Sequence, residues 1–441
     1  MTSEFSSATR RRFLASSATV GAAALIASAS ADAFAEQISG GVSGTGSTAI
    51  RPFHINFPDS ALADLRQRVR ATRWSDRETV PDPSQGVQLA TVQALARYWG
   101  TEYDWHKCQA RLNALPNFIT EIDGLDIHFI HVKSKHADAM PLIVTHGWPG
   151  SIVEQLKIIG PLTDPTAHGA AASDAFHLVI PSMPGYGFSA RPTTPGWGPE
   201  RIARAWDSLM TRLGYTRYAA QGGDWGGIVT DMMGVQAPPG LIGIHSNFPG
   251  VVPPEIDKAA ASGAPAPAGL SADEKEAYDR LVTVYAKGIA YGYQLGLRPQ
   301  SVAAIADSPV GLAAYLLDHD ARSYAHLSRL FVHGEPYGDL TRDDVLDNIT
   351  LTWLTNTEIS SARLYWENKL PFFAVKGVTV PVAVSTFPEE LYPVPRTWAE
   401  QAYPKLIHYM KLDKGGHFAA WEQPASFSDE VRAGLRSLRK T

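Results

Sequence analysis

Three features are scarce or absent in the sequence: cysteine, an excess of positive charge, and a long apolar run near the N-terminus. A single cysteine among 441 residues, Cys108, excludes an intramolecular disulfide and a zinc site built from several thiolates. The chain lacks an excess of positive charge, because its formal net charge is −5, and this excludes the basic surface typical of nucleic-acid-binding proteins. Its weakly apolar N-terminal stretch, residues 15–30, is too short and too mild for a permanent membrane-spanning helix.

The chain does contain enough apolar material for a large core. Hydrophobic residues make up 44% of the sequence and charged residues 19%, a balance typical of a globular protein. The length allows two or three domains, or one long enzyme of the α/β class. Prolines and glycines are too scattered along the chain to indicate disorder or a collagen-like repeat.

The first 35 residues have the features of an export signal and not of a folded domain. Residues 9–14 (TRRRFL) resemble the twin-arginine signal and precede the weakly apolar run. Residues 33–35 (AFA) then form a typical cleavage site before Glu36. We therefore expect residues 1–35 to be a twin-arginine-type signal peptide and the mature protein to be periplasmic or secreted. The alternative is an ordinary secretion signal that carries three arginines.

Helical patterns come first in the mature sequence. A Gly/Ser linker, residues 36–50, precedes three helical stretches at residues 58–74, 87–99 and 105–115. Because these stretches precede every predicted strand, we expect residues 51–120 to form an N-terminal helical region outside the strand and helix repeat.

Strand and helix patterns then alternate along the chain. Each predicted strand is short and mostly apolar, as in a buried parallel sheet, and helical segments separate the strands. The predicted strands are residues 126–132, 142–145, 177–181, 218–221, 242–246, 380–385 and 407–412, and the helices are residues 151–162, 199–213 and 227–236. This alternation predicts an α/β fold, a mostly parallel sheet with helices on both faces, formed by residues 121–251 and 370–441.

The alternation stops between residues 252 and 369. A Pro/Ala/Gly loop leads there into helical patterns at residues 272–290, 309–324, 343–353 and 359–366, and no convincing strand is present. We therefore expect residues 252–369 to be a helical lid inserted over the sheet.

A glycine-rich turn carries the strongest chemical signal. Residues 222–227 (GGDWGG) follow an apolar strand and open a helix. Small residues around a central side chain permit the strained turn called a nucleophile elbow, whose usual form has serine at the centre. Taken alone, the segment is equally consistent with a glycine-rich turn in which Asp224 caps the helix.

Three further segments favour catalysis. Residues 146–149 (HGWP) follow a strand where an α/β-hydrolase places its oxyanion-hole loop, so the backbone N–H groups of Trp148 and Trp225 would face a developing oxyanion. His417 lies on a loop after the last predicted strand, and Glu390 lies just past the preceding strand. The order nucleophile, acid, histidine along the chain is that of the α/β-hydrolase fold.

An aspartate in the elbow indicates alkyl transfer more than acyl transfer. A carboxylic acid with a pKa of about 4 is ionised at neutral pH, so Asp224 would attack saturated carbon without a base. The product is an ester on the enzyme, which water activated by a histidine must hydrolyse. An epoxide also needs a proton donor for its developing alkoxide, and the lid offers tyrosines at positions 291, 293 and 365, whereas a departing halide needs only N–H donors.

The chain resembles the microsomal-type epoxide hydrolases from about Arg51 to its C-terminus. Several motifs carry the resemblance in one order: FITEIDGLDIHFIHV (118–132), HGWPGS (146–151), PSMPGYGFS (181–189), GGDWGG (222–227), SPVGLAAY (308–315) and GGHFAAWEQP (415–424). The resemblance implies an α/β-hydrolase fold with a helical lid and an N-terminal region that wraps around the core. It also implies an epoxide and water as the substrates.

The same resemblance assigns the residues of the covalent mechanism. It implies Asp224 as the nucleophile and His417 as the general base. The acidic partner of the histidine lies in a segment that resembles FPEEL, and alignment to the histidine motif selects Glu390 over Glu389.

Two lid tyrosines are implied as the proton donors. Tyr365 matches a family pattern within residues 360–365 (SSARLY). Counting back from residues 298–299 assigns the other donor to Tyr291. Tyr293 remains the alternative, because this segment is one residue shorter than the family pattern.

Two other functions share parts of this pattern. A haloalkane or haloacid dehalogenase would keep Asp224 and His417, use Trp148 and Trp225 as N–H donors to the halide, and leave the tyrosines as packing residues. A non-catalytic binding protein on the same fold would tolerate loss of triad residues, whereas here every position is filled. No cofactor or metal is predicted, because no histidine and carboxylate cluster has ligand spacing along the chain and this chemistry requires none.

The export signal leads to a direct prediction. Changing both Arg10 and Arg11 to Lys should trap the precursor in the cytoplasm, because the paired arginines are the feature that a twin-arginine signal requires. Cell fractionation followed by immunoblotting measures this. Unchanged export of the double variant would contradict the prediction and favour an ordinary secretion signal.

Overall fold

The computed structural model describes residues 48–440. The predicted signal peptide, residues 1–35, and nearly all of the predicted linker, residues 36–50, lie outside the described residues. Within residues 48–440, no helix is long and apolar enough to cross a membrane.

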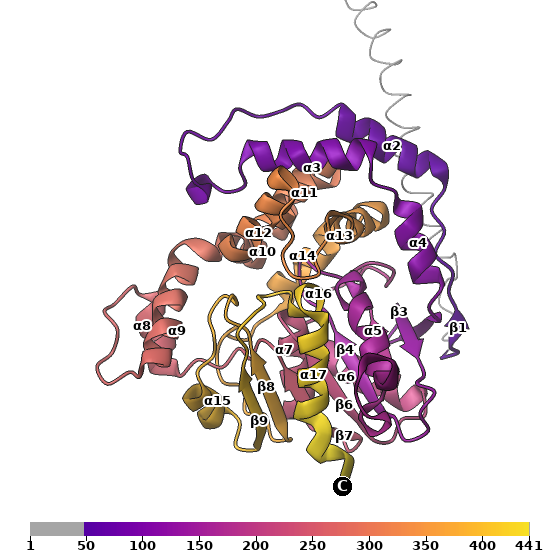
Figure 1. Cartoon of the computed structure of the whole chain (residues 1–441), viewed down its shortest axis with the longest axis vertical. Helices are drawn as coiled ribbons and strands as arrows, with labels where there is room; N and C mark the ends of the chain where they lie inside the picture. Colours follow the sequence, from indigo (N-terminus) through magenta and orange to yellow (C-terminus); the bar gives the residue numbers. More distant parts are fainter. Residues whose placement is uncertain (1–47, 441) are drawn as a thin grey trace, which may run out of the picture. The chain divides into compact units, whose positions relative to one another are not determined.

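A nine-stranded sheet forms the centre of the described chain, in the order β1-β2-β3-β5-β4-β6-β7-β8-β9 (Figure 1). The strands from β5 through β4 to β9 are parallel, whereas β1, β2 and β3 join the edge of the sheet in antiparallel pairs. The bounds are β1 Arg51–Pro52, β2 Asn117–Ile122, β3 Leu125–Val132, β4 Met140–Thr145, β5 Phe176–Pro181, β6 Tyr218–Gly222, β7 Leu241–Ser246, β8 Val382–Thr386 and β9 Leu406–Lys411. The mostly parallel sheet expected from the alternating pattern is therefore present.

Two strands were not predicted, and the expectation that the N-terminal helices precede every strand is wrong. Strand β1 pairs with β2, and β2 pairs with β3 through a two-residue turn at Asp123 and Gly124. Both turn residues have positive φ, 53° and 79°, as an Asp-Gly hairpin turn requires. The pattern missed β1 because a two-residue strand has no periodicity, and it missed β2 because its burial does not alternate cleanly.

Helices cover both faces of the sheet, as Figure 1 shows. On one face α6 (Pro199–Arg212) packs beside α7 (Trp225–Gln236), which contacts the central strands. On the other face α5 (Leu156–Thr163) packs against α17 (Pro424–Leu435), with the short helix α16 (Ala419–Glu422) next to both. The central strands are buried between these layers, which explains their continuous apolar sequence.

The lid is helical as expected, but the predicted helices at residues 272–290 and 309–324 are each interrupted, whereas those at 343–353 and 359–366 are slightly longer than predicted. The lid helices are α8 (Pro254–Ala261), α9 (Ala272–Thr283), α10 (Ala290–Leu297), α11 (Pro309–Leu317), α12 (Ala321–His333), α13 (Arg342–Thr355) and α14 (Glu358–Glu367). The stretch predicted as one helix over residues 309–324 breaks because the side chain of Asp320 caps α12, accepting hydrogen bonds from the backbone N–H groups of Arg322 and Ser323. This break produces a turn that holds His319.

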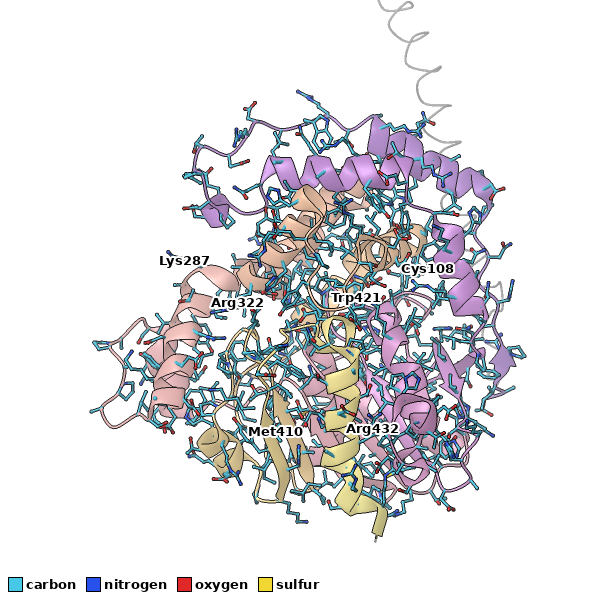
Figure 2. All side chains as sticks on the ribbon, viewed as in Figure 1. Cys108, Lys287, Arg322, Met410, Trp421 and Arg432 are labelled. Atoms are coloured by element: carbon cyan, nitrogen blue, oxygen red, sulfur yellow. The ribbon has the colours of Figure 1, made fainter. Side chains whose placement is uncertain are left out.

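The N-terminal helices α2 (Asp59–Arg70), α3 (Leu89–Thr101) and α4 (Trp105–Asn113) contact the lid. The indole N–H of Trp99 donates to Thr350 Oγ1 at 3.0 Å, and the hydroxyl of Tyr103 donates to Asp347 at 2.7 Å. Cys108, labelled in Figure 2, is fully buried on α4. The N-terminal region therefore stabilises the position of the lid through buried hydrogen bonds and packing contacts.

Candidate active site

Asp224 stands in a strained turn between β6 and α7. Its backbone has φ 51° and ψ −129°, a conformation that costs about 1–3 kcal/mol for a residue with a side chain. The turn is possible because its neighbours are glycines. A Cβ on Gly222 would lie 2.1 Å from the Gly226 carbonyl oxygen, and a Cβ on Gly226 would lie 2.0 Å from the Thr145 carbonyl oxygen. The segment is thus a true elbow, which presents the Asp224 side chain at the carboxyl end of the sheet.

The loop after β4 closes one side of this carboxylate. The backbone N–H of Trp148 donates to Asp224 Oδ1 at 2.8 Å. A Cβ on Gly147 would lie 2.4 Å from the same oxygen, so the loop can approach this closely only with glycine there. Trp225 is the first residue of α7, where an N–H group has no acceptor within its helix. Both predicted oxyanion-hole residues therefore border Asp224.

His417 approaches the other carboxylate oxygen. Its Nε2 lies 3.4 Å from Asp224 Oδ2, and its Nδ1 lies 2.6 Å from Glu390 Oε1. All three side chains are buried. Glu389 points elsewhere, toward His326 and the hydroxyl of Tyr337. The structure thus brings together the nucleophile, base and acid inferred from the sequence.

The charges in this group stabilise one another. Burial favours a neutral His417, but the negative charges of Glu390 and Asp224 outweigh burial and raise the pKa of His417 well above its usual value. Burial also opposes ionisation of Asp224, yet His417, His319 and the Trp148 N–H together lower the pKa of Asp224. The resting site is therefore an ion pair of a carboxylate with an imidazolium.

Two lid tyrosines lie over the ion pair. The Tyr291 ring stacks on Trp148, with ring centroids 5.2 Å apart, and the Tyr365 ring meets Trp225 edge-on at 4.8 Å. The two phenol rings are 5.9 Å apart. Burial and the charge of Asp224 raise the pKa of both phenols well above the usual value, so both stay protonated at neutral pH. Tyr293 is 55% exposed, which leaves Tyr291 as the first tyrosine at the site.

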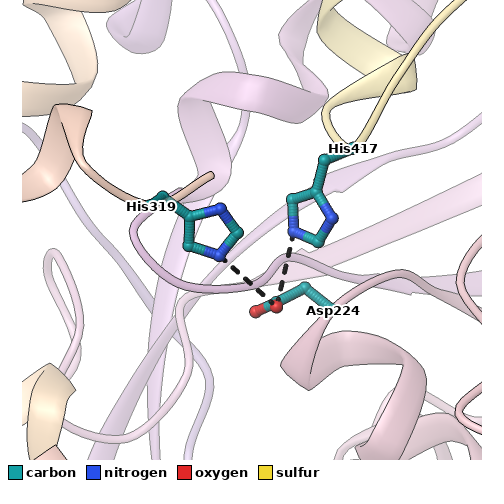
Figure 3. Close-up of side chains that lie close together, drawn as sticks. All are labelled: Asp224, His319 and His417. Atoms are coloured by element: carbon teal, nitrogen blue, oxygen red, sulfur yellow. Dashed lines mark ion pairs between the residues drawn. The ribbon is translucent and has the colours of Figure 1, made fainter. Parts of the chain in front are cut away.

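A second histidine, His319, joins the site without having been predicted. Its Nε2 lies 4.0 Å from Asp224 Oδ2, and its ring is 4.6 Å from that of His417 (Figure 3). No motif marks His319. Its only sequence signal is its place between two aspartates, and the turn that positions it was predicted as helix. The sequence spacing indicated no metal-ligand cluster, but the fold brings Asp224, His319 and His417 together.

Two buried glutamates support the catalytic loops and were also missed. Glu154 accepts a hydrogen bond from the Gly147 N–H at 3.2 Å, and Glu422 accepts one from the Gly416 N–H at 2.6 Å. Burial raises the pKa of Glu154 to about 7 and that of Glu422 to about 8. Each carboxyl thus holds the backbone of a loop that borders Asp224 or His417.

Comparisons with known proteins agree on one family. The family description "Epoxide hydrolase N terminus" matches residues 50–155, and "alpha/beta hydrolase fold" matches residues 140–254. A protein of Stigmatella aurantiaca whose name assigns it provisionally to the epoxide hydrolases is 49% identical over 391 residues, which is 88% of this chain and 86% of that protein. Epoxide hydrolase 1 of Oryctolagus cuniculus is 35% identical over 87% of this chain and 88% of its own length. The crystal structure of juvenile hormone epoxide hydrolase from the silkworm Bombyx mori has a TM-score of 0.78 at 30% identity, covering 89% of this chain and 96% of that chain.

The raised pKa of Glu154 predicts how stability changes with pH. An ordinary glutamate in the unfolded chain titrates near pH 4.3, whereas Glu154 in the folded protein titrates at about 7. Between these values the folded state binds more protons, so stability falls as pH rises from about 4 to 7. Glu154→Gln keeps an acceptor for Gly147 without a charge. It should unfold like the wild type at pH 4 and be more stable at pH 8, by up to about 3 kcal/mol.

Urea unfolding of both proteins at pH 4, 6 and 8 measures the difference. Glu335→Gln, at an exposed position, is the control and should show no such trend. A stability difference for Glu154→Gln that stays constant across the three pH values would contradict the assignment.

Proposed function

This chain belongs to the epoxide hydrolase family, and we propose that it converts epoxides to vicinal diols through a covalent ester on Asp224. The enzyme is a hydrolase that acts on ether bonds. One arrangement carries the proposed mechanism, namely a buried Asp224 carboxylate held between His417 and the Trp148 N–H beneath two phenols. Each of these groups supplies a step that the others cannot perform.

In the first step the carboxylate of Asp224 opens the epoxide. A carboxylate oxygen forms a bond to one epoxide carbon, and the bond between that carbon and the epoxide oxygen breaks. The oxygen takes a proton from Tyr291 or Tyr365, because both phenols are protonated and face the site. Burial of Asp224 favours the attack, since a carboxylate with a reduced hydration shell is a stronger nucleophile.

Between the two steps His417 loses a proton and becomes a base. The charge of Asp224 is one cause of the raised pKa of His417, and ester formation removes that charge. The pKa of His417 therefore falls at this point. The imidazolium returns a proton to the phenolate and becomes the neutral base that the second step needs.

In the second step water hydrolyses the ester. A cavity of about 20 Å³ beside Asp224 and His417, lined also by Gly223 and Asn247, has room for one water molecule. His417 takes a proton from this water, Glu390 stabilises the imidazolium, and the hydroxide attacks the Asp224 carbonyl carbon. The N–H groups of Trp148 and Trp225 stabilise the oxyanion. When it collapses, the bond between the Asp224 carbonyl carbon and the substrate oxygen breaks, and the proton of the added hydroxyl passes to that oxygen. The products are the diol and the Asp224 carboxylate.

The two alternative functions gain no support from these findings. A dehalogenase would leave Tyr291 and Tyr365 as packing residues, whereas the family assignment and their place over Asp224 favour proton donors. A non-catalytic protein would have no need for the buried ion pair of Asp224, His417 and Glu390.

We also propose that the protein is exported through its twin-arginine-type segment. The support is the sequence of residues 9–14 and the cleavage pattern at residues 33–35, both outside the described residues. A mature chain with one cysteine is compatible with export in a folded state, because it needs no disulfide to form after export.

Two neighbouring tyrosines provide a matched test of the proton donors. Tyr291→Phe should slow ring opening about 10²-fold, because it removes a general acid and keeps the ring. Tyr293→Phe makes the same chemical change two residues away, on a side chain that is 55% exposed, and should leave the rate within about twofold. Single-turnover measurement of ring opening with styrene oxide compares them, and Tyr365→Phe should behave like Tyr291→Phe. A slower Tyr293→Phe and an unaffected Tyr291→Phe would contradict the assignment.

A further inference from the structure

Three possible metal ligands converge in the active site, from three separate segments of the chain. Asp224 comes from the elbow, His319 from the turn between α11 and α12, and His417 from the loop after β9 (Figure 3). One ligand atom from each lies within 4.8 Å of the other two, and all three residues are buried. The covalent mechanism uses Asp224 and His417 but assigns no step to His319.

The spacing of these atoms suits a zinc-class ion. Zinc binds imidazole nitrogen and carboxylate oxygen at about 2.0–2.2 Å, so tetrahedral ligand atoms lie about 3.3–3.5 Å apart. Asp224 Oδ2 is 3.4 Å from His417 Nε2 and 4.0 Å from His319 Nε2. The first pair already has the required separation, and the second needs a shift of roughly half an ångström. The ligand atoms of the two histidines lie within 4.8 Å of each other, so the histidine pair closes by at most about 1.5 Å around the ion.

The surroundings of both histidines orient them as ligands. The Nδ1 of His417 bonds to Glu390 at 2.6 Å, and the Nδ1 of His319 bonds to Asp320 at 3.2 Å. A carboxylate on Nδ1 keeps a proton there, so Nε2 is the ligand atom, as in carboxylate–histidine–zinc arrangements. In His417 the Nε2 lone pair becomes available when the ion displaces the proton of the resting imidazolium. Both Nε2 atoms are buried and, apart from their approach to Asp224, have no hydrogen-bond partner among the described residues.

We propose that Asp224, His319 and His417 form an inhibitory site for a divalent cation of the zinc class. Two imidazoles and one carboxylate favour zinc or cobalt over magnesium or calcium, which prefer oxygen ligands. The ion replaces the proton on His417, and the three side chains leave a fourth position for water. The inhibition rests on the proposed function, because the ion occupies the nucleophile and the base of that mechanism together.

The binding test uses the metal-free full-length enzyme and does not depend on catalysis. Isothermal titration with Zn²⁺ should show one tight site per chain, and Co²⁺ should give a visible absorption spectrum of imidazole ligation. His319→Ala should weaken binding more than about 100-fold, since loss of an outer carboxylate alone costs about 10–100-fold. Asp320→Asn tests that outer carboxylate and keeps an N-cap residue on α12, and it should weaken binding about 10–100-fold.

The matched control is His333→Ala, because His333 is an exposed lid histidine at the end of α12. The zinc affinity of this variant should equal that of the wild type. Absence of a stoichiometric site, or a site unaffected by His319→Ala and Asp320→Asn, would overturn the proposal. If His319→Ala does not fold, a Co²⁺ spectrum without imidazole ligation in the wild type would overturn it equally.

Activity measurements separate this proposal from the proposed function. Zn²⁺ should inhibit hydrolysis of styrene oxide over the concentration range in which it binds, and Asp320→Asn should require about 10–100-fold more zinc. Zinc binding at this site in a protein that does not hydrolyse epoxides would refute the proposed function and leave the metal site standing. An active enzyme without this zinc site would refute only the metal site.

Discussion

The ion pair between Asp224 and His417 is the interaction on which the rest of the site depends. A carboxylate in a buried site would normally become protonated, and a protonated Asp224 has no charge with which to attack carbon. His417, with its charge supported by Glu390, keeps Asp224 ionised despite burial. In the proposed mechanism the same interaction sets the order of events, because forming the ester removes the charge that kept His417 protonated.

The surrounding fold buries this pair and holds it in place. The sheet and its glycine-lined elbow hold Asp224 in a backbone conformation that only a rigid neighbourhood can sustain. The lid brings the two phenols over the pair, and the N-terminal helices hold the lid through Trp99 and Tyr103. These helices are far from the chemistry, so we expect them to act by restricting where the lid can lie.

Much of the fold, and the convergence of Asp224, His417 and Glu390, could be predicted from the sequence, because local patterns carry them. Apolar strands alternating with helices indicated the sheet, and the glycines around Asp224 indicated an elbow, since steric limits there are strictly local. His417 and Glu390 followed from their places after successive strands of a parallel sheet. The tyrosine ambiguity could not be resolved, because residues 291 and 293 lie about 200° apart around a helix and only the packing shows which faces inward.

The missed features depend on contacts between distant segments. Strand β1 is defined only by its pairing with β2, and the roles of Glu154 and Glu422 arise from the backbone groups that they meet. His319 reaches Asp224 because Asp320 caps the start of a new helix and leaves His319 in a turn where one continuous helix was expected. Periodicity along the chain contains none of this information.

The covalent ester is the central claim, and isotope labelling tests it most directly. A single turnover with excess enzyme in oxygen-18 water should yield a diol without the label and leave the label in the carboxylate of Asp224, read by mass spectrometry of the peptide. This follows because the water attacks the carbonyl carbon of Asp224 and not the epoxide. A diol that carries the label after the first turnover, with an unlabelled Asp224, would contradict the account.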